Sequence, residues 1–160
     1  DVYKRQIING GVINSIKSNA KFGKGEWTVL EADESDGSFL KLPINYSVVT
    51  NLDNEHLDFY KNFNNLKNAF TKFINKTPPT GKSIICIDNN NIKKIFNKIK
   101  NQNILTYGES KKADYQVKKI KFYFDSTSFD LSFKTKDKKR ANIKLRKHYL
   151  SRDNKRRNLT

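Results

Sequence analysis

Short apolar runs alternate with longer stretches in which apolar residues recur every three or four positions. Two of the longer stretches, residues 63–74 and 92–99, each carry one apolar helical face. Strands and helices that alternate in this way are typical of a parallel sheet with crossover helices. We therefore expect an α/β fold: a mostly parallel sheet with flanking helices. The expected strands are residues 27–32 (WTVLEA), 46–50 (YSVVT), 83–87 (SIICI) and 103–106 (NILT).

The pattern changes after Gly108. Residues 117–124 and 129–133 alternate between apolar and polar side chains on either side of a turn at 125–127. A period of two on both sides of a turn predicts an antiparallel hairpin. Residues 143–145 supply a short third strand. We expect a small antiparallel β-sheet over residues 109–146, after a partial α/β core over residues 7–108.

The two ends differ from the rest of the chain. The sequence contains no Met, and its first six residues, DVYKRQ, show no periodicity. We expect residues 1–6 to be non-native and the chain to be a fragment. Residues 147–160 are rich in Lys and Arg and lack an apolar pattern. We expect them to form a disordered or aberrant tail.

The formal net charge of +16 is typical of proteins that bind nucleic acids or other polyanions. The basic residues are mostly Lys, however, and are spread along the chain together with many Asn and Ile residues. Arg would be favoured at positions that read base edges, because its planar fork binds them bidentately. We therefore expect no dedicated nucleic-acid role. The alternative is a binding module that contacts phosphates through the basic hairpin and tail, residues 134–157.

The chain carries one cysteine, Cys86, inside an apolar run, so no disulfide can form within it. No apolar stretch approaches the ~20 residues that span a bilayer. We expect a soluble, cytoplasmic protein that does not contact membranes. The sequence does not predict an oligomeric state.

Four carboxylates follow the first expected strand within six residues. Like charges this close repel one another unless a cation or hydrogen-bond donors compensate them. In open α/β sheets, ligands bind at the carboxyl ends of the strands, which is where this cluster falls. The four are Glu31, Asp33, Glu34 and Asp36.

A second polar cluster, residues 53–58 (DNEHLD), follows the second expected strand. Both clusters are therefore expected on one rim of the sheet. A phosphate-bound Mg²⁺ ion there would take one or two carboxylates together with water and phosphate oxygens. Glu31, at the strand end, is the first candidate ligand. The alternative is that both clusters are solvated loops whose carboxylates cap local turns.

Five segments of the chain resemble the central ATP-binding domain of the Mur ligases, a domain related to P-loop NTPases. The likeness runs from about residue 7 to residue 145, and its first segment is similar to a loop that precedes the family's acidic motif. The motif EADESD is similar to the acidic motif of the branch of the family that joins L-alanine to UDP-N-acetylmuramate. The segments are 7–27 (IINGGVINSIKSNAKFGKGEW), 29–42 (VLEADESDGSFLKL), 48–60 (VVTNLDNEHLDFY), 64–74 (NNLKNAFTKFI) and 104–108 (ILTYG).

The resemblance implies roles for individual residues. Glu31 matches the carboxylate that holds the Mg²⁺ ion bridging the ATP phosphates. His56 matches the ligand of a second Mg²⁺, although His is an uncommon ligand for this ion. Asp33, Glu34 and Asn51 are implied to face substrate or metal-bound water. The side chains of Glu31 and His56 are thus expected to converge on one cation pocket, at the ends of neighbouring parallel strands.

The chemistry that the resemblance implies is amide formation driven by ATP. The lactyl carboxylate of UDP-N-acetylmuramate attacks the γ-phosphate, and the amine of L-alanine then displaces phosphate from the acyl phosphate. Two anions must meet in the first step, so metal ions are needed to neutralise them. We expect the isolated fragment to be inactive, because the family's phosphate loop and two flanking domains are outside it.

Two further segments resemble nucleotide-binding motifs. Residues 80–83 (TGKS) match the end of a phosphate loop, but they run into an expected strand, whereas phosphate is bound by the N-terminus of a helix. We interpret residues 77–83 (TPPTGKS) as a turn between a helix and a strand. His148 is in a segment similar to the family's adenine-contacting G-[KR]-H-N motif. The glycine and the asparagine of that motif are missing, so an exposed tail histidine is the alternative.

Overall fold

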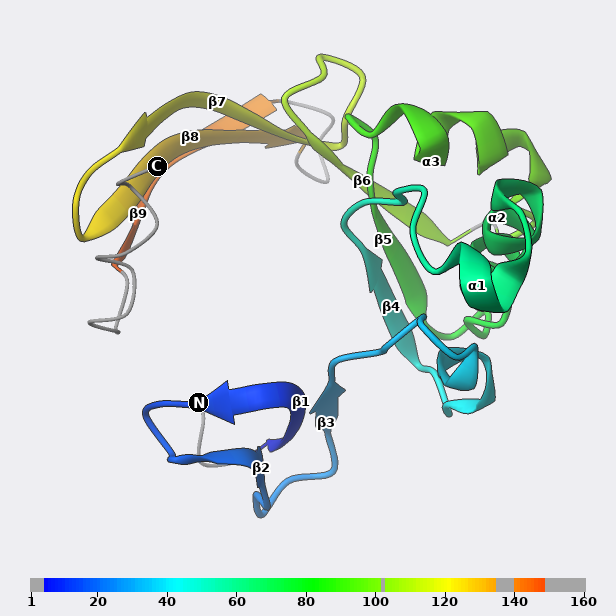
Figure 1. Ribbon diagram of the computed structural model, residues 1–160. Helices are drawn as coiled ribbons and strands as arrows, with labels where there is room; N and C mark the ends of the chain where they lie inside the picture. The colour runs from blue at the N-terminus through cyan, green and yellow to red at the C-terminus, as the bar shows by residue number, and fades with distance from the viewer. Residues whose placement is uncertain (1–4, 102, 135–139, 149–160) are drawn as a thin grey trace.

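The computed structural model describes residues 5–101, 103–134 and 140–148. Its strands form two sheets (Figure 1). The larger sheet has six strands in the order β4-β5-β6-β7-β8-β9, and the smaller has three in the order β2-β1-β3. The larger sheet is mixed: its first three pairings are parallel and its last two antiparallel. The α/β class expected from the sequence is confirmed.

The parallel half of the large sheet contains three of the expected strands and both expected helices. Short 3-10 helices lie at Ser38–Lys41 (η1) and Phe96–Lys98 (η2), and the second extends α3. The elements are β4 (Tyr46–Val49), α1 (Leu57–Tyr60), α2 (Phe63–Asn75), β5 (Lys82–Cys86), α3 (Asn90–Ile95) and β6 (Ile104–Gly108).

Helix α2 follows directly from its sequence. The side chain of Asn62 accepts a hydrogen bond from the backbone amide of Asn65 and caps the first turn. The helix ends before Pro78, and residues 76–81 turn the chain into β5. The prediction that TPPTGKS leads from a helix into a strand is therefore confirmed, with its last two residues, Lys82 and Ser83, already in β5. The apolar face of α2 is buried through Leu66, Ala69, Phe73 and Ile74.

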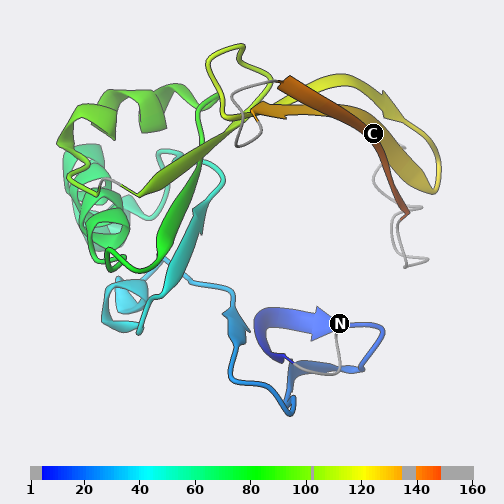
Figure 2. The same cartoon turned by 180° about the vertical axis from the view of Figure 1, so that it is seen from behind.

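The core lies on one face of the parallel strands, which the helices cover (Figures 1 and 2). In β4, Ser47 and Val49 are buried, whereas Tyr46 and Val48 are 51% and 59% exposed. We expected the parallel strands to be buried on both faces. For β4 this prediction is wrong, because only one of its faces is buried. Its opposite face is covered by no helix of the described residues.

The expected antiparallel hairpin is confirmed as β7 (Tyr115–Phe122) and β8 (Ser126–Lys134), and the third strand as β9 (Arg140–His148). These strands extend the parallel half, because β7 pairs with β6 at Tyr107 and Gly108. The strongly curved antiparallel strands project away from the helices (Figure 1). Lys147 and His148 belong to β9, and the rest of the tail, residues 149–160, lies outside the described residues.

The N-terminal region differs from our expectation. Residues 7–27 were expected to form a loop, but they include most of β1 (Gln6–Ile13) and all of β2 (Ser18–Lys21), which pair antiparallel. Strand β3 (Thr28–Leu30) pairs with β1 rather than with β4. The prediction that the host strands of Glu31 and His56 are neighbours is therefore wrong. All three residues of β3 are exposed, so this strand adds no side chain to the buried core.

Residues 1–4 lie outside the described residues. Gln6 begins β1 and pairs with Thr28. The non-native origin of residues 1–6 stays a prediction.

Candidate functional site

The two polar clusters meet, although their strands do not. The acidic loop, residues 31–36, follows β3, and the loop of residues 50–56 leads from β4 into α1. The hydroxyl of Tyr60, in α1, donates a 2.6 Å hydrogen bond to the backbone carbonyl of Glu34. Tyr60 is only 7% exposed, so this bond ties the two loops together at the edge of the core.

A glycine allows the loops to approach closely. Gly37 has a φ of 73°, a left-handed conformation that favours glycine. A Cβ atom at this position would stand 3.0 Å from a ring carbon of Phe59 in α1. The acidic loop can therefore pass under the Phe59 ring because residue 37 has no side chain.

His56 faces the acidic loop. Its Nε2 atom lies 3.4 Å from Oε1 of Glu34, and both side chains are about one-third exposed. The backbone of His56 adopts a φ of 56°, which is uncommon for a residue other than glycine. Such conformations cluster at functional sites. Of the acidic residues expected at this rim, the structure brings Glu34 to His56.

Glu31 is directed elsewhere. Its Oε2 atom accepts a 2.6 Å hydrogen bond from the backbone amide of Gly10 in β1, and its own amide donates to the carbonyl of Ile8. No partner is recorded for its other carboxylate oxygen among the described residues, and the side chain is exposed. The structure therefore gives no direct contact between Glu31 and His56.

The remaining carboxylates of the acidic loop cap local turns. Asp33 accepts a hydrogen bond from the amide of Ser35 at 2.8 Å, and Asp36 accepts one from Ser38 at 2.9 Å. Hydrogen bonds from Ser35 lower the pKa of Asp33, and those from Ser38 lower the pKa of Asp36, because they favour the ionised form. For these two residues the structure matches the alternative of capped, solvated turns.

Asn51 lies in the second loop. Its side-chain amide donates a 2.6 Å hydrogen bond to Asp53. Its side-chain carbonyl oxygen accepts a hydrogen bond from the hydroxyl of Thr50. Among residues 5–101, 103–134 and 140–148, no three His, Cys, Asp or Glu side chains gather closely enough to hold a metal ion by themselves. Mg²⁺ keeps several water or phosphate ligands, so one or two protein ligands fit its chemistry.

His148 occupies a different part of the molecule. Its backbone pairs with Ser126 at the end of β9, and β9 is separated from β4 by four strands of the same sheet. The structure therefore does not join His148 to the rim that carries His56. Sequence reasoning missed Tyr60, and the signal available was its spacing of four residues from His56, which is one helical turn.

No helix among the described residues is long and apolar enough to span a membrane.

Parallel strands with covering helices, and two polar loops that meet through Tyr60 and Glu34, define an α/β domain with a polar rim beyond the end of β4. Residues 12–154 match the model of the Mur ligase middle domain. The chain therefore belongs to the Mur ligase family.

The chain is similar to curated relatives that share one name. The chain is 50% identical over 138 residues to the UDP-N-acetylmuramate–L-alanine ligase of Pelagibacter ubique, covering 86% of this chain and 30% of that protein. It is 42% identical over 128 residues to the ligase of the same name from Rhizobium johnstonii, covering 80% of this chain and 27% of the relative. The chain thus spans less than a third of the length of these relatives. They give no support to the alternative of a nucleic-acid-binding module.

Solved structures agree on the fold. A crystal structure of UDP-N-acetylmuramate-alanine ligase from Thermotoga maritima superposes with a TM-score of 0.67 at 22% identity, over 90% of this chain and 31% of that one. The MurF ligase of Thermotoga maritima, solved in complex with ADP, superposes with a TM-score of 0.63 at 18% identity, over 92% of this chain and 35% of that one.

Proposed function

We propose that this chain is part of the ATP-binding domain of an enzyme that joins L-alanine to UDP-N-acetylmuramate in peptidoglycan synthesis. The observation that carries the proposal is the 50% identity to a ligase of that name over 86% of the chain. The meeting of the two polar loops through Tyr60 and Glu34 supports it independently.

Within this proposal, carboxylates and His56 surround a magnesium-dependent phosphate site. Glu31 is the first candidate ligand, because its exposed carboxylate keeps an oxygen without a recorded partner among the described residues. Oε1 of Glu34 lies 3.4 Å from Nε2 of His56, so these two side chains are further candidate metal ligands. Asp33 and Asn51 belong to the same two loops, and each already holds a local hydrogen bond.

The proposed reaction needs two anions, a carboxylate and the γ-phosphate of ATP, to approach one another. Bound Mg²⁺ would supply the positive charge that lowers this repulsion. The protein's part is to fix the donors before the substrates arrive, and the buried Tyr60 hydrogen bond does this for the acidic loop. His148 is retained as a candidate nucleotide contact only on the resemblance of its segment.

A chimera tests the proposal. The 138-residue match of the Pelagibacter ubique ligase would be replaced by the corresponding residues of this chain, and L-alanine ligation to UDP-N-acetylmuramate would be measured with ATP. We expect the chimera to ligate, and its Glu31→Gln variant to lose at least ~100-fold in kcat, the order seen when one transition-state charge contact is removed. A folded chimera without ligation, or an unaffected Glu31→Gln variant, would contradict the proposal.

The isolated chain is expected to release no phosphate from ATP in the presence of both substrates, since it spans less than a third of its relatives. Phosphate release that depends on L-alanine would refute this expectation. The cytoplasmic location expected from the sequence stays a prediction.

A further inference from the structure

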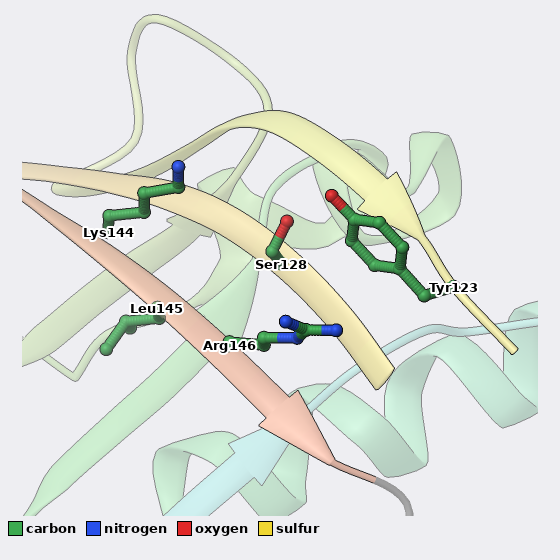
Figure 3. Close-up of a pocket in the computed structure, with 5 residues that line it drawn as sticks. All are labelled: Tyr123, Ser128, Lys144, Leu145 and Arg146. Carbon is green, nitrogen blue, oxygen red and sulfur yellow. The ribbon is translucent and has the colours of Figure 1, made fainter. Parts of the chain in front are cut away.

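A hollow of about 320 Å³ lies on one face of the antiparallel strands, far along the sheet from the rim described above (Figure 3). Figure 3 shows Lys144 and Ser128 projecting on the same side of the strands, with Arg146 beside the ring of Tyr123. Sequence analysis considered this region only as part of the basic hairpin and tail, residues 134–157, and did not predict a hollow here. The lining residues are Tyr123, Ser128, Lys144, Leu145 and Arg146.

The strand register places basic residues on both sides of β8. Ser128 of β8 pairs with Lys121 of β7 and with Arg146 of β9. One step along the same face, Asp130 pairs with Lys118 and with Lys144. Residues directly opposite one another share a face of the sheet, so two rows of basic side chains flank a central strand of small and acidic residues.

The only carboxylate in these rows is already engaged. Asp130 lies 3.4 Å from Nζ of Lys119. Among the described residues, no ion pair or hydrogen bond is recorded for the exposed side chains of Lys121 and Lys144. Like charges gathered on one face repel one another, and an anion bound between them would relieve that repulsion.

Arg146 is held in a defined orientation. Its Nε atom donates a 3.1 Å hydrogen bond to the hydroxyl of the fully buried Ser126, and its guanidinium carbon stands 5.0 Å from the centre of the Tyr123 ring. Both contacts orient the guanidinium plane, and among the described residues only its Nε atom is hydrogen-bonded, which leaves the outer N–H groups to face the hollow.

We propose that this hollow binds the phosphate group of a small phosphorylated ligand. The Arg146 guanidinium offers paired N–H donors, Lys144 offers a point charge on the same strand, and the Ser128 hydroxyl offers a further donor on the neighbouring strand β8. The planar fork of Arg binds phosphate oxygens bidentately, and Lys binds phosphate as a point charge. The site does not depend on the proposed ligase function, since its residues take no part in the rim around His56.

Titration with inorganic pyrophosphate, followed by calorimetry on the full chain, tests the proposal. We expect saturable binding that weakens about tenfold in Arg146→Gln and severalfold in Lys144→Gln, as the loss of a charge-assisted hydrogen bond predicts. Lys147→Gln is the matched control, because Lys147 is exposed, lies on the same strand and pairs with Thr127 on the opposite face. It removes the same charge and is expected to weaken binding less than about twofold.

Three outcomes would overturn the proposal. These are the absence of saturable binding, equal losses in Arg146→Gln and Lys147→Gln, and an affinity for oligonucleotides that grows with length and is reduced equally by all three substitutions. The last two would indicate diffuse attraction by a basic surface. Circular dichroism checks that Arg146→Gln still folds. Lys144→Gln changes only an exposed side chain without recorded contacts, so it keeps the test valid if Arg146→Gln does not fold.

Discussion

Tyr60 joins the two loops of the candidate site through its hydroxyl. Replacing it with Phe keeps the buried ring and removes only the bond to the Glu34 carbonyl. We expect Tyr60→Phe to lower the free energy of unfolding by about 1 kcal/mol, the usual net value of such a bond. Urea denaturation measures this change.

Tyr46→Phe is the matched control for Tyr60. Tyr46 is 51% exposed, and no hydrogen bond of its hydroxyl is recorded among the described residues. We expect a change below about 0.5 kcal/mol. An equal effect of the two substitutions would show that the Tyr60 hydroxyl does not tie the loops together.

Tyr107 gives the fold a dependence on alkaline pH. Burial raises the pKa of Tyr107 above its usual value of 10.0, and the neighbouring Cys86 raises it further. The folded protein therefore holds this proton more tightly than the unfolded chain does. The resulting stabilisation is fully present below pH 10 and is lost as the pH rises through the higher folded pKa.

We expect Tyr107→Phe to lose less unfolding free energy between pH 9 and pH 12 than the parent chain does, and Tyr46→Phe to follow the parent. Denaturation at several pH values would show this, and identical slopes for Tyr107→Phe and the parent would contradict it.

Glu34 shows which property of the site could not be predicted from the sequence, namely the direction of each carboxylate. All four carboxylates of the acidic loop were recognisable as a group, and the loop was correctly expected near His56. Their individual directions depend on local donors: the Gly10 amide holds Glu31, and Ser35 holds Asp33. Only Glu34 is left to face His56. Such choices are made by backbone geometry, which residue types alone do not specify.

At the scale of elements, caps set the ends of the helices. Asn62 caps α2, and we expect Asn62→Ala to cost about 1 kcal/mol of unfolding free energy, while Asn62→Asp retains most of it. Asn64→Ala, on the exposed first turn of the same helix, is the control and is expected to cost less than about 0.5 kcal/mol. Thermal unfolding distinguishes them, and equal effects would contradict the role of the cap.

Periodicity predicted the strands and helices that carry apolar side chains, which are the core strands, α2, α3 and the antiparallel hairpin. It failed for β1, because Gly10 and Gly11 interrupt the apolar run and glycine is uncommon in strands. It also misplaced β3. The pairing of β3 with β1 depends on contacts between segments that are distant in the sequence. All residues of β3 are exposed, so their apolar pattern does not indicate which strand β3 pairs with.

At the scale of the whole molecule, the described chain covers only one face of its parallel strands. We therefore expect the two neighbouring valines of β4 to respond very differently. Val49→Ala, at a residue only 3% exposed, should cost about 2 kcal/mol of unfolding free energy, because buried methyl groups are lost and a cavity is left.

Val48→Ala, at a residue 59% exposed on the open face, should cost less than about 0.5 kcal/mol. Denaturation of both variants under the same conditions measures the difference. A cost for Val48→Ala that matches the cost for Val49→Ala would mean that the second face is also covered.

The central claim is that the acidic loop and the loop before α1 share one cation site. Titration of the chain with Mn²⁺, a paramagnetic stand-in for Mg²⁺, tests it directly by nuclear magnetic resonance. The claim predicts that the amide signals of residues 31–36 and 53–57 broaden together at the same low ratio of metal to protein, and that excess Mg²⁺ restores them. Broadening confined to one of the two loops, or absent from both, would contradict it.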